Sequence, residues 1–149
     1  MRLPIQIEAI LFKKTDGEIQ YLLLKRIPPS GEFWQPITGG LEEGETIMEA
    51  LKREIREETG IENIIRIIDD VHYFELRNLP FIEYLKKLGQ TCVYLKEYVF
   101  VVEVALGEVV DLDTEEHSEY RWCGFEDALG LLKWRENKVA LKKLNEILS

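Results

Sequence analysis

The feature that most constrains the fold of this chain is the segment 39–61, GGLEEGETIMEALKREIREETGI. A pair of glycines opens it, and a helical pattern follows. Within that pattern Ile47, Leu51 and Ile55 recur every four residues and predict one buried face. Gly60 follows the last helical residue, a position where glycine commonly ends a helix. The segment therefore predicts a loop, a helix and a second loop.

Three glutamates lie on another face of this helix. Glu54, Glu57 and Glu58 are spaced i, i+3 and i+4, so their carboxylates lie side by side. Carboxylates this close repel one another unless a positive charge lies between them. A ligand set made only of oxygen suits a hard divalent cation such as Mg²⁺. The pattern predicts a Mg²⁺ site, with Mn²⁺ as an alternative ion; the competing interpretation is a solvated acidic helix.

The composition is that of a folded, acidic protein. Hydrophobic residues make up 46% and charged residues 32% of the 149 residues, and the length suits a single domain spanning 1–149. The net charge of −9 argues against non-specific binding to nucleic acid or to an anionic membrane. It permits an anionic small substrate if a metal reverses the local charge. Because neither a signal peptide nor a membrane span is recognisable, we expect a cytoplasmic protein.

The remaining segments predict an α+β chain. Strands come first, the glutamate helix lies in the middle, and strands and helices follow. A segment rich in proline and glycine, Ile27–Pro36, predicts an exposed loop, and Arg77–Cys92 has no regular pattern. The predicted strands are Ile5–Phe12, Ile19–Arg26, Ile64–Glu75, Tyr94–Val104 and Glu119–Gly124, the first two forming a hairpin, and the predicted later helices are Phe125–Leu132 and Glu136–Leu148.

The segment 39–61 also resembles the Nudix box, which reads G, five residues, E, seven residues, REUxEExGU, with U an aliphatic residue. The chain is therefore similar to the MutT-like Nudix hydrolases, which cleave nucleoside diphosphates linked to another moiety. The resemblance implies an α/β/α sandwich around a mixed β-sheet, with the box as a loop-helix-loop catalytic motif. The matching residues are Gly39, Glu45, Arg53, Glu54, Ile55, Glu57, Glu58, Gly60 and Ile61.

The resemblance also implies roles for the box residues. Glu54, Glu57 and Glu58 are expected at the metal, and the main-chain carbonyl of Thr38 or Gly39 is expected as a further ligand. Glu57 is a candidate both for metal binding and for deprotonating water, and the sequence does not separate these roles.

Two residues complete the predicted catalytic site. Arg53 is expected to pair with Glu45, pointing away from the metal carboxylates, and so to support the site rather than to react. Glu116 stands six residues before Trp122, a placement that resembles MutT-type members. It is a candidate general base or additional ligand, with a solvated acidic loop as the alternative. For His117 a structural role is the more common one.

The flanking residues resemble one branch of the family. The run from Phe33 to Gly39, FWQPITG, is similar to the segment before the box in dihydroneopterin triphosphate and dATP pyrophosphohydrolases. This implies a nucleotide or pterin triphosphate as the small-molecule substrate, with diadenosine polyphosphates, general nucleotide-pool cleaning or non-catalytic nucleotide binding as alternatives. The predicted substrate-binding residues are Arg26, for phosphates, and Phe33, Trp34 and Gln35; Phe81 and Tyr84 are weaker aromatic candidates.

Overall fold

A computed structural model describes residues 2–28, 31–76 and 95–148, with the main chain alone described for 2–4, 69–76 and 95. The irregular segment expected between Arg77 and Cys92, with its two aromatic candidates, lies outside the described residues. Within them, no helix is both long and apolar enough to cross a membrane.

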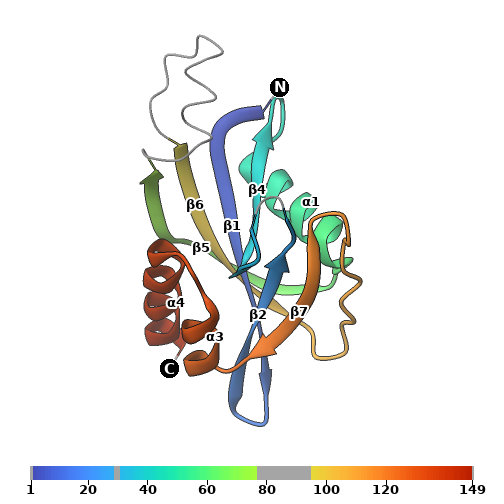
Figure 1. Ribbon diagram of the computed structural model, residues 1–149, viewed down its shortest axis with the longest axis vertical. Coiled ribbons are helices and arrows are strands. Elements are labelled where there is room, and N and C mark those ends of the chain that lie inside the picture. The colour runs from blue at the N-terminus through green and yellow to red at the C-terminus, as the bar shows by residue number, and fades with distance from the viewer. Residues whose placement is uncertain (1, 29–30, 77–94, 149) are drawn as a thin grey trace.

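A seven-stranded mixed sheet lies at the centre of the molecule (Figure 1). Its strand order is β3-β2-β1-β6-β5, while β4 pairs with β1 and β7 pairs with β2. The β1–β6 pair is parallel and the other pairs are antiparallel, so the predicted mixed sheet is confirmed. The strands are β1 (Arg2–Thr15), β2 (Glu18–Arg26), β3 (Trp34–Gln35), β4 (Ile37–Glu42), β5 (Ile64–Leu76), β6 (Leu95–Val104) and β7 (His117–Cys123).

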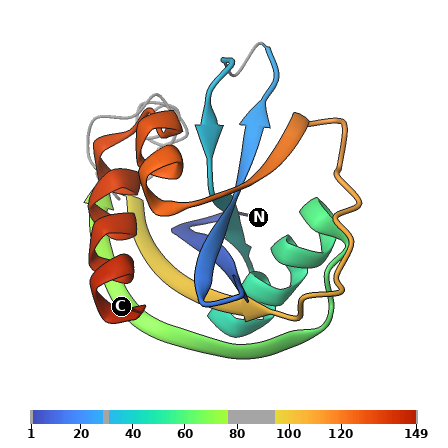
Figure 2. The same cartoon turned by 90° about the horizontal axis from the view of Figure 1, so that it is seen from below.

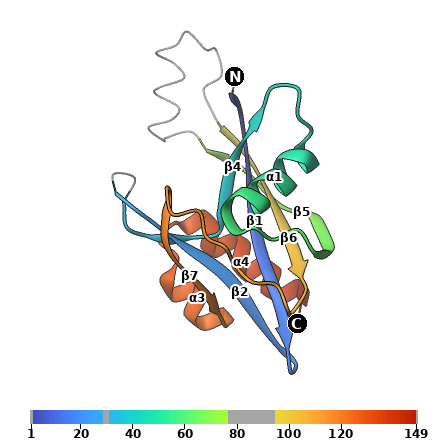
Figure 3. The same ribbon diagram turned by 90° about the vertical axis from the view of Figure 1, so that its right-hand side faces the viewer.

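The three described helices lie on two sides of this sheet. Helix α1 (Ile47–Thr59) lies on one side, and α3 (Phe125–Leu131) and α4 (Arg135–Leu148) lie on the other, as Figure 2 shows. Figure 3 shows the same layers from the side of α1. The predicted α+β class and α/β/α sandwich are therefore confirmed.

Alternating side chains build a separate core on each face of the sheet, as expected for strands buried on both sides. In β1, Ile7 and Leu11 pack in the core under α1, whereas Ile10 and Phe12 pack under α3 and α4. This alternation fixes which polar residues of the same strands point to which helix layer.

Long-range pairing explains where the sequence expectations differ from the structure. The segment Ile27–Pro36 was expected to be an exposed loop, but Trp34 and Gln35 form β3 against β2, and Gln35 is buried. β4 was not expected as a strand, because its glycines and the preceding proline give no local strand signal. It forms because it pairs with residues of β1 from Gln6 to Ala9.

Candidate active site

Helix α1 is held at both ends. Its N-cap Thr46 accepts a hydrogen bond from the Glu49 main-chain N–H, and the Glu49 side chain accepts one from the Thr46 N–H, so the two residues form a capping box. Gly60 ends the helix with a left-handed φ of 72°. Buried Leu51 and Ile55 fix the rotation of the helix against the sheet. The row of glutamates therefore has a fixed direction.

Arg53 is the centre of a hydrogen-bond network on this helix. Its Nε and Nη2 donate to the two carboxylate oxygens of Glu45, over 2.7 and 3.0 Å, which confirms the predicted pair. Nη2 also donates to the Gly40 carbonyl. Nη1 donates to Glu54 over 2.8 Å and to Glu57 over 3.2 Å. Arg53 therefore does not point away from the metal carboxylates, as expected from sequence, but connects two of them to the glycine loop.

The glycine loop and Glu54 are in direct contact. A Cβ atom at Gly39 would lie 2.1 Å from Cδ of Glu54, a separation that no real side chain allows. Gly39 is therefore needed because the Glu54 carboxylate occupies the space beside its Cα. This contact places the main chain of β4 against the first carboxylate of the row.

The three carboxylates differ in their exposure and ionisation. Glu54 is 9% exposed and Glu58 is 3% exposed, whereas the Glu57 side chain is about half exposed. Burial raises the pKa of Glu54 to about 7, although Arg53 opposes the shift. Glu57 and Glu58 add to the increase through their negative charges. A cation bound among these groups would relieve both the repulsion and the desolvation cost.

Glu58 belongs to a second cluster, formed with the β7 end. Oxygen or nitrogen atoms of Glu58, Glu116 and His117 all lie within 4.8 Å of one another. His117 Nδ1 lies 2.9 Å from Glu58 Oε2, and both side chains are buried. Burial alone would raise the pKa of Glu58, but His117, Glu116 and Arg26 together lower it. A hydrogen bond with Glu58 raises the pKa of Glu116, so Glu116 is the carboxyl of the pair that takes up a proton more readily.

A polar cleft of about 460 Å³ brings Glu54 and Glu116 together with predicted substrate-binding residues, while Glu57 and Glu58 do not line it. Arg26 lies in its wall, where Nη1 is 3.6 Å from a Glu116 oxygen. Gln6, Gly40 and Glu42 also line the cleft and were not expected there from sequence. The predicted site residues that line it are Arg26, Phe33, Gln35, Thr38, Gly39, Glu54 and Glu116.

Trp34 takes a different position from its neighbours. Its ring is partly buried in the core under α3 and α4, and the Arg121 guanidinium lies 5.1 Å from the ring centre. It is not among the residues that line the cleft, so its role in binding substrate stays a prediction. Phe33 does line the cleft, and its ring makes an edge contact with Trp134, which does not line the cleft.

The donor set suits a hard divalent cation. Glu54 and Glu58 are buried carboxylates on adjacent turns, and Glu58, Glu116 and His117 bring ligand atoms within 4.8 Å of one another. Buried negative charges that repel one another are costly, and a cation offsets them. The residues present therefore fit the cation that the acidic helix implies.

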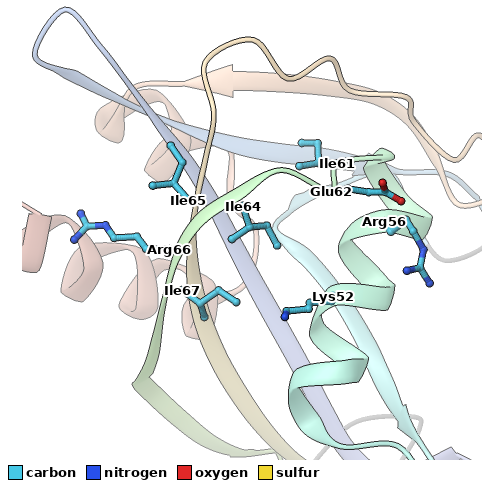
Figure 4. Close-up of a pocket in the computed structure, with 8 residues that line it drawn as sticks. All are labelled: Lys52, Arg56, Ile61, Glu62, Ile64, Ile65, Arg66 and Ile67. Atoms are coloured by element: carbon cyan, nitrogen blue, oxygen red, sulfur yellow. The ribbon is translucent and has the colours of Figure 1, made fainter.

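A second cleft, of about 480 Å³, lies on the other side of α1 (Figure 4). Ile64 and Ile67 of β5 line it with apolar side chains, and Lys52 and Arg56 of α1 also line it. None of the predicted site residues lines this cleft. The acidic row and this basic, apolar groove therefore occupy different faces of the same helix.

The comparisons with known proteins agree with this geometry. The model of the NUDIX domain family matches residues 4–144, nearly the whole chain. The chain belongs to the Nudix family. It is thus a hydrolase of a family that acts on phosphoanhydride bonds and generally uses divalent metal ions.

Similar proteins span more than one activity within this family. A mouse asymmetrical bis(5'-nucleosyl)-tetraphosphatase is 32% identical over 93% of this Nudix chain and 87% of its own length. A dihydroneopterin triphosphate diphosphatase from Haemophilus influenzae is 30% identical over 91% and 83%. A solved structure described as a NUDIX hydrolase from Listeria monocytogenes superposes with a TM-score of 0.81 at 32% identity, covering 98% of this chain and 94% of its own.

Proposed function

We propose that this Nudix hydrolase is a Mg²⁺-dependent pyrophosphohydrolase that converts a nucleoside triphosphate or dihydroneopterin triphosphate to the monophosphate and pyrophosphate. The observation that carries the proposal is the juxtaposition of Glu54 with the glycine loop at the floor of a polar cleft whose wall contains Arg26. Phosphoanhydride hydrolysis requires charge neutralisation on phosphate oxygens together with an aligned water. The same cleft offers acidic groups for a cation and a guanidinium for phosphate.

Glu54, Glu57 and Glu58 would hold the cation, together with the carbonyl of Thr38 or Gly39. When bound, Mg²⁺ or Mn²⁺ would offset the negative charge of the phosphates and favour loss of a proton from water. Arg53 would keep two of the carboxylates in position through the contacts described above.

The remaining roles concern the proton and the substrate. The oxygen of a water molecule attacks phosphorus, the phosphoanhydride bond breaks, pyrophosphate leaves, and a carboxylate accepts the proton. Glu57 is the proposed acceptor because it is the most exposed member of the row. Glu116 is the second candidate, since it lines the cleft beside Arg26. Arg26 would bind phosphate, and Phe33 and Gln35 would contact the rest of the substrate.

A second candidate function is asymmetrical cleavage of a dinucleoside tetraphosphate. The identity of 32% with the mouse tetraphosphatase supports it as directly as the 30% identity supports the first candidate. A binding protein without activity is disfavoured because every glutamate of the box is present. Residues 1–149 acting as one domain, and a cytoplasmic location, stay predictions from the sequence.

A hydrolysis panel with Mg²⁺, followed by chromatography of the products, tests the proposal. It would contain dATP, GTP, dihydroneopterin triphosphate and diadenosine tetraphosphate, with Mn²⁺ as a second metal. We expect pyrophosphate from a triphosphate; ATP from the dinucleotide would favour the second candidate instead. Tight nucleotide binding without any product would support the non-catalytic alternative. The variant Glu58→Gln should require a higher Mg²⁺ concentration for half-maximal rate while keeping the same fold.

A further inference from the structure

A second group of buried acids lies on the opposite face of the sheet, under α4. Glu8 of β1 is fully buried and Glu97 of β6 is 3% exposed, and both extend from the face that carries Ile10 and Phe12. Burial raises the pKa of Glu8 well above its ordinary value, and the adjacent Glu97 raises it further. Burial also raises the pKa of Glu97. Two buried carboxylates are costly to ionise together, so the pair favours a proton on one of its members.

Amide side chains supply the hydrogen bonds seen at this pair. Asn137 Nδ2 donates to Glu8 Oε1 over 2.5 Å, and Gln6 Nε2 donates to Glu97 Oε2. Glu8 Oε2 and Asn137 Oδ1 are buried and make no hydrogen bond with any residue that the structure describes. These amide donors already donate to carboxyl oxygens, so the two atoms left without a hydrogen bond are acceptors. A ligand that satisfies this group must therefore bring hydrogen-bond donors.

Glu97 and Asn137, but not Glu8, line a cavity of about 210 Å³ that adjoins the polar cleft. Gln6, Gln35 and Thr38 line both, so the two spaces lie side by side. Cavities that enclose whole drug-sized ligands measure about 300–1,000 Å³, so this one suits a single ring system. Glu97 lies in its wall, and Trp134 at its side offers a flat aromatic face.

The position of Trp134 connects the cavity with the predicted stacking residue. Its ring centre lies 5.5 Å from that of Phe33, with the two rings at 83°. Trp134 remains 42% exposed, which is unusual for so large an apolar ring and leaves part of it open to a ligand. From the same stretch of chain, Glu136 and Asn137 also line the cavity. An aromatic face and acceptor groups therefore converge on one small space.

We propose that this cavity binds the heterocyclic ring of the substrate and selects a ring edge with adjacent N–H and NH₂ donors, as guanine and pterins present. A carboxylate accepts two parallel hydrogen bonds from such an edge through Glu97, and Asn137 Oδ1 can accept a further one. The Watson–Crick edge of adenine alternates a donor with an acceptor and satisfies fewer of these groups. The inference rests on the proposed function, since the phosphates of the same molecule would lie in the adjoining polar cleft.

The first test compares binding of GMP, IMP and AMP to the unaltered protein by isothermal titration calorimetry. GMP and IMP differ only in the 2-amino group, and none of the three contains a phosphoanhydride bond. We expect IMP and AMP to bind at least about tenfold more weakly than GMP, because hydrogen bonds to charged groups contribute about 1.5–3 kcal/mol. Neopterin, titrated in parallel, distinguishes a pterin-specific pocket from a guanine-specific one. Equal affinities for GMP, IMP and AMP, with neopterin no tighter, would overturn the proposal.

A matched pair of variants locates the selectivity. Glu97→Gln replaces the proposed acceptor and should bring the GMP and IMP affinities to within about twofold of each other. Glu103→Gln changes a glutamate on the same strand that pairs with Arg66 outside the cavity, and should retain the difference. A preserved difference in Glu97→Gln would exclude Glu97 as the selecting group. If that variant does not fold, the comparison of nucleotides on the unaltered protein decides alone.

The two proposals can fail separately. Hydrolysis of triphosphates without any preference for the ring would retain the proposed function and remove this inference. Selective binding of GMP or neopterin without hydrolysis of any triphosphate or dinucleotide would do the reverse.

Discussion

The molecule buries carboxylates on both faces of its sheet, and the two groups have different partners. Under α1, Arg53 bridges Glu54 and Glu57 to the glycine loop. Under α4, the hydrogen bonds to Glu8 and Glu97 come from amide side chains. A guanidinium favours the ionised form of the carboxylates beside it, whereas amides stabilise a carboxyl group without a full positive charge.

This difference suggests that the two groups bind different parts of a ligand in two adjoining spaces. The group under α1, which comprises Arg53, Glu54 and Glu57 and is called the cation-linked group, suits metal and phosphate, where negative charge must be balanced. The group under α4, called the amide-linked group, suits a neutral ring that donates hydrogen bonds. Its members are Gln6, Glu8, Glu97 and Asn137. Gln6, Gln35 and Thr38 line both spaces, so a single substrate can reach both groups. If the two groups differ in this way, substitutions in the first should change metal binding and turnover, and substitutions in the second should not affect the metal.

The largest effect is expected at the cation-linked group. Glu57→Gln should lower kcat by a factor of about 10² to 10⁴, the usual consequence of removing a general base, without loss of the fold. The measurement is the steady-state rate of pyrophosphate release at saturating Mg²⁺, with circular dichroism to verify folding. Glu43→Gln, an exposed change in the neighbouring loop, serves as the control and should keep the rate. Near-normal turnover in Glu57→Gln would move the proton acceptor to Glu116.

Removing the guanidinium should uncouple the helix from the loop. Arg53→Ala leaves Glu45 and Glu54 without their charged partner and should lower the free energy of unfolding by about 1.5–3 kcal/mol. Urea unfolding measures this. Arg56→Ala changes an arginine on another face of α1 and should stay within about 0.5 kcal/mol of the parent protein. Equal stability of the two variants would mean that the Arg53 network is not what secures the loop.

Most of the cation-linked group could be predicted from sequence because its residues lie close together along the chain. Helix, cap and glycine stop all lie within one segment, and the pair Arg53–Glu45 was expected from the resemblance to the Nudix box. The additional contacts of Arg53 with Glu54 and Glu57 were missed, because side-chain length lets one guanidinium reach groups on several turns. The burial of Glu58 against His117 was also missed, since it depends on the loop before β7.

The amide-linked group was missed entirely, for a physical reason. Its members come from β1, β6 and α4, and the parallel pairing of β1 with β6, in which Gln6 lies opposite Glu97, brings the two strands together. A local signal did exist: Gln6 and Glu8 alternate with apolar residues and share a face with Ile10 and Phe12. Two polar residues on an otherwise buried strand face indicate either an edge or a polar pocket, and sequence spacing does not choose between them.

A smaller effect on the cation-linked group is expected from crowding its loop. Gly39→Ala would place a methyl group 2.1 Å from Cδ of Glu54, so the carboxylate or the loop must move. Displacing a supporting contact of this kind typically weakens metal binding about 10- to 100-fold. Titration of Mn²⁺ followed by electron paramagnetic resonance would measure it. Gly107→Ala, where a Cβ meets no neighbour within 4 Å, is the matched control among the described residues. Unchanged Mn²⁺ affinity in Gly39→Ala would separate Glu54 from the metal site.

The smallest effect expected is a pH dependence of stability that belongs to the amide-linked group. Because the folded-state pKa of Glu8 is raised, the folded protein binds the extra proton that the unfolded chain releases. The stabilising contribution is present below the ordinary glutamate pKa and is lost as the pH rises through the raised value. Unfolding in urea with a metal chelator present should therefore give a smaller free energy of unfolding at pH 8 than at pH 5.5.

The variant Glu8→Gln keeps the size of the side chain beside Glu97 and Asn137 and cannot ionise. It should therefore reduce the dependence of the free energy of unfolding on pH. The pKa of Glu97 on β6 is raised as well, and the negative charge of Glu136 on α4 adds to the increase at Glu8. The pKa of Glu54 is also raised, to about 7, so a residual slope in the variant contains the contributions of Glu54 and Glu97. An unaltered pH dependence in Glu8→Gln would show that the extra proton is not held by Glu8 and Glu97. The two acid groups would then differ in the ligands they bind and not in their ionisation.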